Sequence, residues 1–293
     1  MRIPFPIATV GVMVFTLYWS YRGFASPGFR DRYTFSPARV LGNRQYYRLL
    51  SCGFLHLNWL HLLLNLFSLY SVGAAIELSF GLWGIPVFLL IYLGSIAGGS
   101  LLSLYLHRNH YGYQALGASG GVCGVIFAYI FLSPPGTWIP FFFILLPSWL
   151  FAILFILVSF FGLRNQLGGI GHDAHLGGAI IGLLITTALR PTIVVQRPVL
   201  YFAVIGLSVA LFVHLYRVPL YMPGSNPLTP AYWRRMWREV QTRRQAKQEW
   251  EDKETMDRLL AKISRSGMGS LTAAEMRKLK AISKRMRESG RMH

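Results

Sequence analysis

A serine flanked by glycines stands at the start of an apolar stretch, in the sequence Gly117-Ala118-Ser119-Gly120-Gly121. At a helix N-terminus, such a serine leaves room for a substrate backbone and has free N–H groups beside it that stabilise negative charge. Ser119 is therefore a candidate nucleophile. Clusters of small residues in membrane helices also serve close helix packing, so the motif alone leaves both interpretations open.

A second apolar stretch carries a titratable side chain, His175, followed by Gly178 and Gly182. Spacings of three and four residues put these positions on one helix face, where glycines allow a neighbouring helix to approach closely. An imidazole brought next to a serine hydroxyl in this way can act as its general base. An ionisable residue inside a span is a functional hypothesis by default, and a purely structural histidine is the alternative.

A third polar pair, His61 and Asn65, lies four residues apart within a predicted span, so both side chains project from one face. Both residue types donate hydrogen bonds to a developing oxyanion. Hydrogen bonding between helices is the alternative role for Asn65.

The composition is that of a membrane protein. Of the 293 residues, 53% are hydrophobic and 14% are charged. Seven stretches have the apolar content of membrane helices, with a hydrocarbon core requiring about 20 residues each. They are residues 5–22, 54–76, 84–106, 117–133, 147–162, 173–190 and 198–217. The predicted fold class is all-α, a polytopic membrane helix bundle, because backbone polar groups in lipid must be satisfied within their own segment.

Two connections and the chain start have distinct patterns. The longest connection, residues 22–51, mixes arginines with aromatic residues and suits the headgroup layer. Residues 133–147 are apolar but rich in proline, which predicts a loop or partial strand. The apolar start after Arg2 has features of a signal peptide, and we interpret it as a retained first helix because a membrane bundle follows.

The two cysteines are too few for a zinc site, and neither a metal nor a cofactor is predicted.

The composition changes after residue 222, which predicts a transmembrane domain at 1–222 and a basic extramembrane tail at 223–293. Apolar residues recur at helical spacing before Ser266-Gly267, and Thr272 with Glu275 forms a capping box. We expect a short helical hairpin; a disordered basic tail is the alternative.

The formal charge of +18 would suggest nucleic acid in a soluble protein. Beside a membrane bundle, anionic lipid headgroups explain the same residues, at about 1 kcal/mol per Lys or Arg near the surface. Trp233 and Trp237 among clustered arginines make only a faint case for nucleic acid. The expected partner of the tail is therefore the lipid bilayer and not nucleic acid.

The three polar elements together resemble the rhomboid family of intramembrane serine proteases. The family pattern is a histidine and an asparagine four residues apart on the second helix, Gly-x-Ser-Gly on the fourth, and Ala-His followed by spaced glycines on the sixth. All three occur here in that order, the last as Ala174-His175. The resemblance covers residues 5 to 190 and extends to Tyr46-Tyr47-Arg48 and to Glu77 before Gly81. It implies a rhomboid-like six-helix core with a seventh C-terminal transmembrane helix.

The resemblance implies a role for each matched residue. Ser119 attacks the scissile carbonyl after passing its proton to His175, with no carboxylate completing a triad. The oxyanion site is formed by His61, Asn65 and the backbone at Gly117 and Ser119. Supporting positions are Gly120, Gly178, Gly182, Arg48, Glu77 and His56.

Three nearby residues need separate interpretation. Asp173, near the start of its helix, is expected to be a cap. His172 is a rival base, but only His175 follows an alanine and precedes the spaced glycines of the family pattern. Cys123 stands where part of the family has a tyrosine that stacks on the catalytic histidine, so we expect packing to orient His175.

The resemblance also implies substrates and location. Single-pass membrane proteins with unstable helices are the expected substrates, cleaved in or beside the membrane, and the expected location is a bacterial cell (inner) membrane. A rhomboid-like protein that binds or remodels membrane proteins without cutting them is the main alternative. A transporter is the other, for which the spans show no internal repeat. The positive-inside rule and the layout of the best-known bacterial rhomboids favour opposite orientations.

Overall fold

The computed structural model describes residues 5–141, 144–165, 171–217 and 230–289. The chain divides into two compact units. We call Met1–Asn109 with Tyr113–Met222 the bundle, and His110–Gly112 with Pro223–His293 the tail unit. The predicted domain boundary after residue 222 lies within 218–229, outside the described residues.

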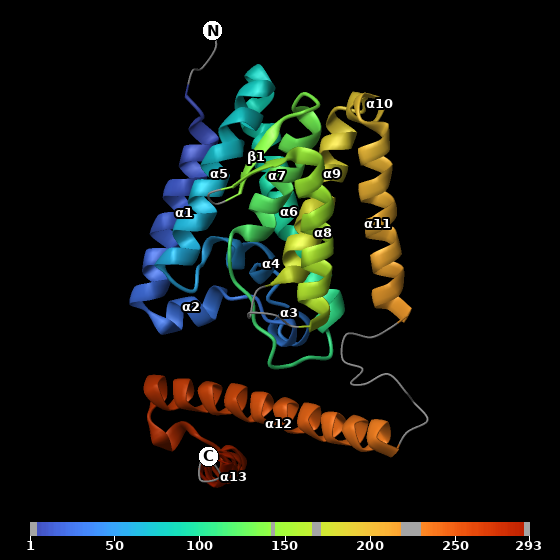
Figure 1. The fold of residues 1–293 in the computed structure, drawn as a ribbon. Helices are drawn as coiled ribbons and strands as arrows, with labels where there is room; N and C mark the ends of the chain where they lie inside the picture. Colours follow the sequence, from blue (N-terminus) through green and yellow to red (C-terminus); the bar gives the residue numbers. More distant parts are fainter. Residues whose placement is uncertain (1–4, 142–143, 166–170, 218–229, 290–293) are drawn as a thin grey trace. The chain divides into compact units, whose positions relative to one another are not determined.

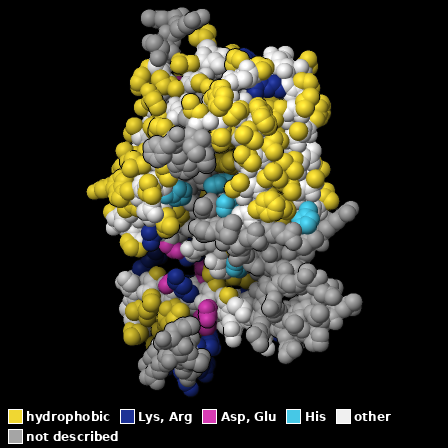
Figure 2. Space-filling model, viewed as in Figure 1, with side chains coloured by type: hydrophobic (Ala, Val, Ile, Leu, Met, Phe, Trp, Pro, Cys, Tyr) yellow, Lys and Arg dark blue, Asp and Glu magenta, His cyan; other side chains and the backbone are white. Residues whose placement is uncertain are grey.

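A helix occupies each of the seven predicted ranges, which confirms the polytopic helical bundle (Figure 1). These helices are α1 (Ile7–Ala25), α5 (Trp59–Ser79), α6 (Gly84–His107), α7 (Ser119–Leu132), α8 (Ser148–Asn165), α9 (His172–Leu189) and α11 (Pro198–Arg217). Among the described residues, α5, α6, α9 and α11 are long and apolar enough to cross a membrane, and α7 and α8 are shorter apolar helices. Hydrophobic side chains cover most of the visible face of the bundle, as lipid contact requires (Figure 2).

The long connection after α1 forms three short helices, α2 (Pro27–Tyr33), α3 (Pro37–Gly42) and α4 (Arg48–Ser51), and then a 3₁₀ turn, Cys52–Phe54. Helices α2 and α3 lie at one end of the bundle, and α10 (Thr192–Gln196) lies at the other (Figure 1). The second predicted span begins at Trp59 and not at residue 54, because the Asn58 side chain accepts a 2.8 Å bond from the His61 N–H and caps the helix there.

Helices α6, α7 and α9 pack against one another in the centre of the bundle, and α5 also contacts α7. Backbones approach closely where α7 meets α9. A Cβ atom added at Gly178 would overlap the backbone of Gly120, and one at Gly182 would overlap that of Gly124. Glycine at these positions is therefore a packing requirement, and the contact brings the first turns of α7 and α9 together.

The proline-rich stretch between α7 and α8 contains an antiparallel hairpin of β1 (Trp138–Phe141) and β2 (Ile144–Pro147). The partial strand predicted for this stretch is thus confirmed, and it is a small exception in a helical unit. Ile139 is buried against α7 and α8, while Trp138 and Leu145 are exposed.

The tail unit contains α12 (Pro230–Ser266) and α13 (Ala273–Ser289), with a 3₁₀ turn, Met268–Ser270, between them. Gly267 has φ +74°, a conformation that favours glycine, and it ends α12. The predicted capping box is confirmed: the Thr272 N–H donates to Glu275 Oε2 at 2.8 Å, and the Glu275 N–H donates to Thr272 Oγ1 at 3.2 Å. Leu259 and Ile282 are buried on the apolar sides of the two helices.

Candidate active site

The hydroxyl of Ser119 and the imidazole of His175 lie in direct hydrogen-bond contact, with 2.6 Å between Ser119 Oγ and His175 Nε2. Ser119 is the first residue of α7, and His175 lies in the first turn of α9. The glycine contacts between these helices allow the short distance. A serine hydroxyl hydrogen-bonded to an imidazole nitrogen is the arrangement of an activated nucleophile and its base.

The start of α7 has the features of an oxyanion site. The first N–H groups of a helix, here those from Ser119 onward, have no partner within the helix. Gly117, with φ +143°, turns the chain just before them. A Cβ atom at Gly117 would lie 2.9 Å from His61 Cε1 and 3.5 Å from Ser119 Oγ. The absence of a side chain at Gly117 therefore lets the His61 ring lie close to the turn that precedes Ser119.

Asn65 lies one turn after His61 on α5 and is largely buried. Its Nδ2 donates a 2.9 Å hydrogen bond to the His61 carbonyl oxygen. An amide nitrogen carries two hydrogens, so Asn65 can donate a second bond while the first holds its orientation. The pair predicted from sequence is thus linked by a hydrogen bond within one helix.

His56 is fully buried between α1 and the segment before Ser119. The Ala118 N–H donates to His56 Nε2 at 3.3 Å, and His56 Nδ1 lies 2.9 Å from Ser20 Oγ. Ser20 in turn donates to the Phe54 carbonyl at 2.9 Å. This chain of bonds requires Nδ1 of His56 to carry the proton, and it holds the backbone beside the nucleophile.

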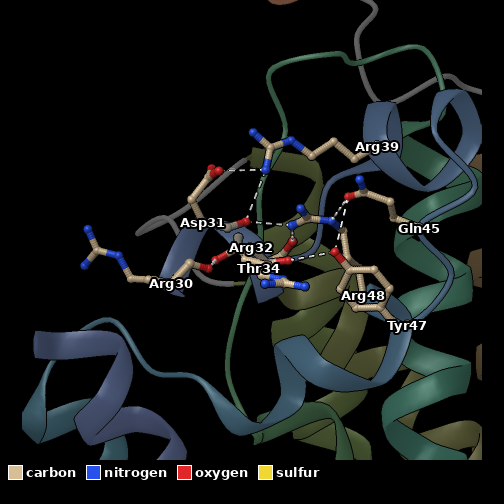
Figure 3. Close-up of polar contacts among 8 residues, drawn as sticks. All are labelled: Arg30, Asp31, Arg32, Thr34, Arg39, Gln45, Tyr47 and Arg48. Carbon is tan, nitrogen blue, oxygen red and sulfur yellow. Dashed lines mark hydrogen bonds and ion pairs between the residues drawn. The ribbon is translucent and has the colours of Figure 1, made fainter. Parts of the chain in front are cut away.

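Arg48 organises the connection between α1 and α5 (Figure 3). Its Nη1 donates to the carbonyl oxygens of Asp31 and Thr34 at 2.7 and 2.6 Å, and its Nε donates to Gln45 Oε1 at 2.6 Å. The side chain is only 2% exposed, so these acceptors replace the water it has lost. Arg48 therefore ties the start of α4 to the C-terminal end of α2 and to the turn that precedes α4.

Glu77, near the end of α5, lies at the N-terminus of α1. Its carboxylate accepts bonds from the backbone N–H of Ala8 and Thr9 at 2.9 and 2.8 Å and from Thr9 Oγ1 at 2.8 Å. A carboxylate in this place satisfies N–H groups that a helix leaves unpaired and complements the helix dipole. Glu77 thereby joins α1 to α5.

An aromatic ring that the sequence analysis missed faces the candidate base. Phe155 of α8 stacks on His175, with 6.4 Å between ring centroids and 28° between planes. Cys123 is buried in the same apolar cluster. Phe155 thus supplies an aromatic contact to His175, as part of the family does with a tyrosine at the position of Cys123. The position gave no signal in the sequence, because any apolar residue on α8 would fit the same pattern.

The prediction that Asp173 caps its helix is wrong. Gly171 is the N-cap of α9, and among the described residues no side chain caps that end. Asp173 is buried and faces α6, where it lies 3.1 Å from His107 Nε2 and accepts bonds from Tyr113. The prediction failed because partners distant in sequence, and not the local backbone, satisfy the carboxylate. His107, an ionisable residue directly after the predicted span 84–106, was a signal that could have revealed this cluster.

The rival base His172 lies next to His175, with 6.0 Å between the ring centroids. His175 is the histidine whose Nε2 shares a hydrogen bond with the Ser119 hydroxyl. Within the described part of the chain, no group of three or more His, Cys, Asp or Glu residues is arranged to hold a metal ion.

Fold and site together define a class: helical membrane proteins with a serine and a histidine in contact between two closely packed helices. Residues 43–192, just over half of the chain, match the family model of the Rhomboid domain. The chain therefore belongs to the rhomboid family, which supports intramembrane protease activity at the level of the family. It is an integral membrane protein. Residues 243–285, in the tail unit, match a family of unknown function, DUF6576.

The chain is similar to several curated relatives. It is 31% identical over 158 residues to "RHOMBOID-like protein 12, mitochondrial" of Arabidopsis thaliana, covering 48% of this chain and 46% of the relative. It is 30% identical over 159 residues to "Rhomboid protease GluP" of Bacillus subtilis (strain 168), covering 51% and 27%. It is 28% identical over 153 residues to "Rhomboid protein 1, mitochondrial" of Saccharomyces cerevisiae (strain ATCC 204508 / S288c), covering 51% and 43%. The matches span less than half the length of these relatives.

Proposed function

We propose that this chain is an intramembrane serine endopeptidase with Ser119 as nucleophile and His175 as general base. The observation that carries the proposal is the 2.6 Å contact between Ser119 Oγ and His175 Nε2, made by residues 56 positions apart in the chain. Membership of the rhomboid family supports the same chemistry.

The proposed reaction proceeds through an acyl-enzyme. Ser119 Oγ attacks the scissile carbonyl carbon while His175 Nε2 takes the hydroxyl proton. As the tetrahedral intermediate collapses, the C–N bond breaks and His175 returns the proton to the leaving amine. A water molecule then attacks the ester, with His175 again accepting and returning the proton, and Ser119 is regenerated.

The negative charge on the carbonyl oxygen develops, in this proposal, beside Gly117. The Ser119 backbone N–H, the His61 ring and the second Asn65 hydrogen are the donors. The Ala118 N–H is already bonded to His56 and is not among them. Loss of one such donor typically lowers the rate about 100- to 1,000-fold.

The proposed substrates are single-pass membrane proteins cut within or beside the membrane. A peptide bond in a helix cannot reach Ser119, because its carbonyl is hydrogen-bonded and its backbone is enclosed by side chains. Local unwinding is therefore required, and Gly, Pro or polar residues in the substrate helix make it easier.

Purified protein in liposomes, a transmembrane substrate with an unstable helix and a fluorophosphonate probe provide the test. Ser119→Ala should abolish both cleavage and labelling, and His175→Ala should reduce both by at least about 1,000-fold. Ser71→Ala, which removes an exposed serine of α5, is the matched control and should behave as wild type. Equal cleavage by wild type and Ser119→Ala would refute the proposal.

We propose a bacterial cell membrane as the location. Relatives named mitochondrial and chloroplastic show that the family also occurs in organelles of eukaryotes. The described part of α11 ends on the side of the bundle that carries α2 and α3 (Figure 1). A reporter fused after Arg243, read against markers on each side of the membrane, would identify the compartment that this end faces.

We also propose that the tail contacts anionic headgroups. On α13, Arg277, Lys278, Lys280 and Lys284 have exposed side chains. Attraction of about 1 kcal/mol per basic residue favours such contact. Hydrogen exchange of α13 should slow in vesicles containing phosphatidylglycerol relative to phosphatidylcholine vesicles, and an R277Q, K278Q, K280Q variant should lose the difference. Equal exchange in both lipids would contradict the proposal.

A further inference from the structure

A buried carboxylate outside the proposed catalytic pair joins three segments of the bundle. Asp173, in the first turn of α9, is 1% exposed. The Tyr113 hydroxyl donates to its two oxygens at 2.9 and 3.1 Å, and His107 Nε2 lies 3.1 Å from Oδ2. The Tyr113 ring also stacks on the His107 ring, with 3.6 Å between centroids and 6° between planes. A buried carboxylate is tolerated only with partners of this kind, so the arrangement has a defined geometry.

The cluster lies close in sequence to both residues of the proposed pair. Tyr113 precedes Ser119 by six residues in the loop between α6 and α7, and Asp173 precedes His175 by two. The Tyr113–Asp173 bond therefore links the segment leading to the nucleophile with the segment leading to the base.

Other bonds of the loop lead away from α9. Ala115 exchanges two backbone bonds with Phe35, at 3.0 and 3.2 Å, and the Gly117 N–H donates to the Cys52 carbonyl at 3.0 Å. These bonds fix the loop to the connection between α1 and α5. Tyr113 supplies a bond from the same loop to α9.

The proposed catalytic pair thus has a fixed contact on each side. Toward the C-terminal ends of α7 and α9, the glycine contacts of Gly178 with Gly120 and of Gly182 with Gly124 set the spacing of the helices. On the N-terminal side of the pair, the Tyr113–Asp173 bond fixes the distance between the loop before α7 and the start of α9. Two contacts that flank a pair of side chains restrict rotation as well as separation of the helices that carry them.

We infer that Asp173 and Tyr113 are positioning residues that hold Ser119 and His175 at reacting distance. The inference rests on the proposed function of that pair. A displacement of about 1 Å in a reacting group can lower the rate about 100-fold. Release of the loop from α9 should therefore lower kcat and leave KM unchanged, because neither residue belongs to the proposed oxyanion site or touches the nucleophile.

The central test compares Tyr113→Phe, which removes only the hydroxyl, with Tyr111→Phe, the same change two residues earlier in the loop. Measured in liposomes, Tyr113→Phe should lower kcat by about tenfold without changing KM, within the range expected for a small displacement. Fluorophosphonate labelling of Ser119, normalised to folded protein by gel filtration, should slow by the same factor. Tyr111→Phe should match wild type.

Two further variants separate positioning from general stability. Asp173→Asn keeps an oxygen that accepts from Tyr113, so it should retain more activity than Asp173→Ala. Because both residues act through one bond, Tyr113→Phe should lower kcat no further in an Asp173→Ala background. A multiplied loss in the double variant would overturn the inference, as would wild-type kcat and labelling in Tyr113→Phe.

The two proposals fail in different ways. If Ser119→Ala cleaves as wild type does, the proposed function is wrong and the positioning role falls with it. If cleavage depends on Ser119 and His175 but Tyr113→Phe matches Tyr111→Phe, only the positioning role is wrong.

Discussion

Two helix pairs in this chain are held together by different means. Helices α7 and α9 meet through the backbones of glycines, with no space for a Cβ atom at Gly178 or Gly182. Helices α12 and α13 meet through an apolar stripe and through ion pairs, Lys262 with Glu275 at 2.8 Å and Arg285 with Asp252 at 2.7 Å.

The difference follows from the surroundings of each pair. In lipid, apolar side chains gain little by leaving the solvent, so close packing of small residues and satisfied polar groups hold helices together. The tail unit is predicted to lie outside the membrane. There, burial of Leu259 and Ile282 provides a hydrophobic contribution, and the partly exposed pair of Lys262 and Glu275 adds little. A change in side-chain size should therefore be damaging at the α7–α9 contact, and a changed side chain should be tolerated at the α12–α13 contact.

The largest effect is expected at the glycine contact. Gly178→Leu should abolish cleavage and lower the unfolding temperature, because the new side chain separates α9 from α7 and His175 from Ser119. Gly206→Leu on α11 is the matched control, since a Cβ atom there meets nothing within 4 Å. Cleavage assays with thermal unfolding would check this, and an active Gly178→Leu would contradict the geometric requirement.

The next effect is expected at Gly117, beside the proposed oxyanion site. Gly117→Ala should lower kcat about 100- to 1,000-fold, as loss of an oxyanion donor does. The methyl group would lie 2.9 Å from His61 Cε1 and displace that ring, and φ +143° disfavours alanine. His61→Ala should lose activity to a similar extent. Steady-state cleavage would measure both, and near-wild-type kcat in Gly117→Ala would place the oxyanion elsewhere.

A smaller effect is expected at the ring that faces the base. Phe155→Leu should lower kcat about three- to tenfold, in line with the usual strength of an aromatic pair, and Phe155→Tyr should keep wild-type activity. Phe67→Leu, an exposed position on α5, is the control. Equal kcat values for Phe155→Leu and Phe155→Tyr would show that stacking does not orient His175.

The smallest effect is expected in the tail. The bond from Lys262 lowers the pKa of Glu275 from 4.5 to about 2. Because the pKa is lower in the folded state, the stabilisation is complete above pH 4.5 and is lost as the pH falls toward 2. Hydrogen exchange of α13, corrected for intrinsic rates, should therefore rise on acidification through this window. At neutral pH, Glu275→Gln should raise exchange only about twofold, as for other exposed pairs.

A large rise in the hydrogen exchange of α13 in Glu275→Gln at neutral pH would contradict the contrast between the α7–α9 and α12–α13 contacts. It would make a partly exposed ion pair as critical as the glycine packing. Lys253→Gln, an exposed basic position on α12, serves as the control for loss of a charge.

The sequence by itself determined the helical class, the approximate spans, the capping box of α13 and the grouping of His61, Asn65, Ser119 and His175 as site candidates. These features have local causes: apolar length, side-chain hydrogen bonds across one turn, and motifs of fixed spacing. The start of α5 was missed by five residues, because hydropathy alone does not register the Asn58 cap.

The tertiary structure decided which side chains meet across the chain. It gave Asp173 the partners Tyr113 and His107 in place of the cap predicted from its position, and it placed Phe155 on His175. It also brought Ser119 Oγ to 2.6 Å from His175 Nε2, although the two residues are 56 positions apart in the chain. Helical periodicity tells which face a residue occupies but not which helix that face meets, and those contacts arise only when the whole bundle packs.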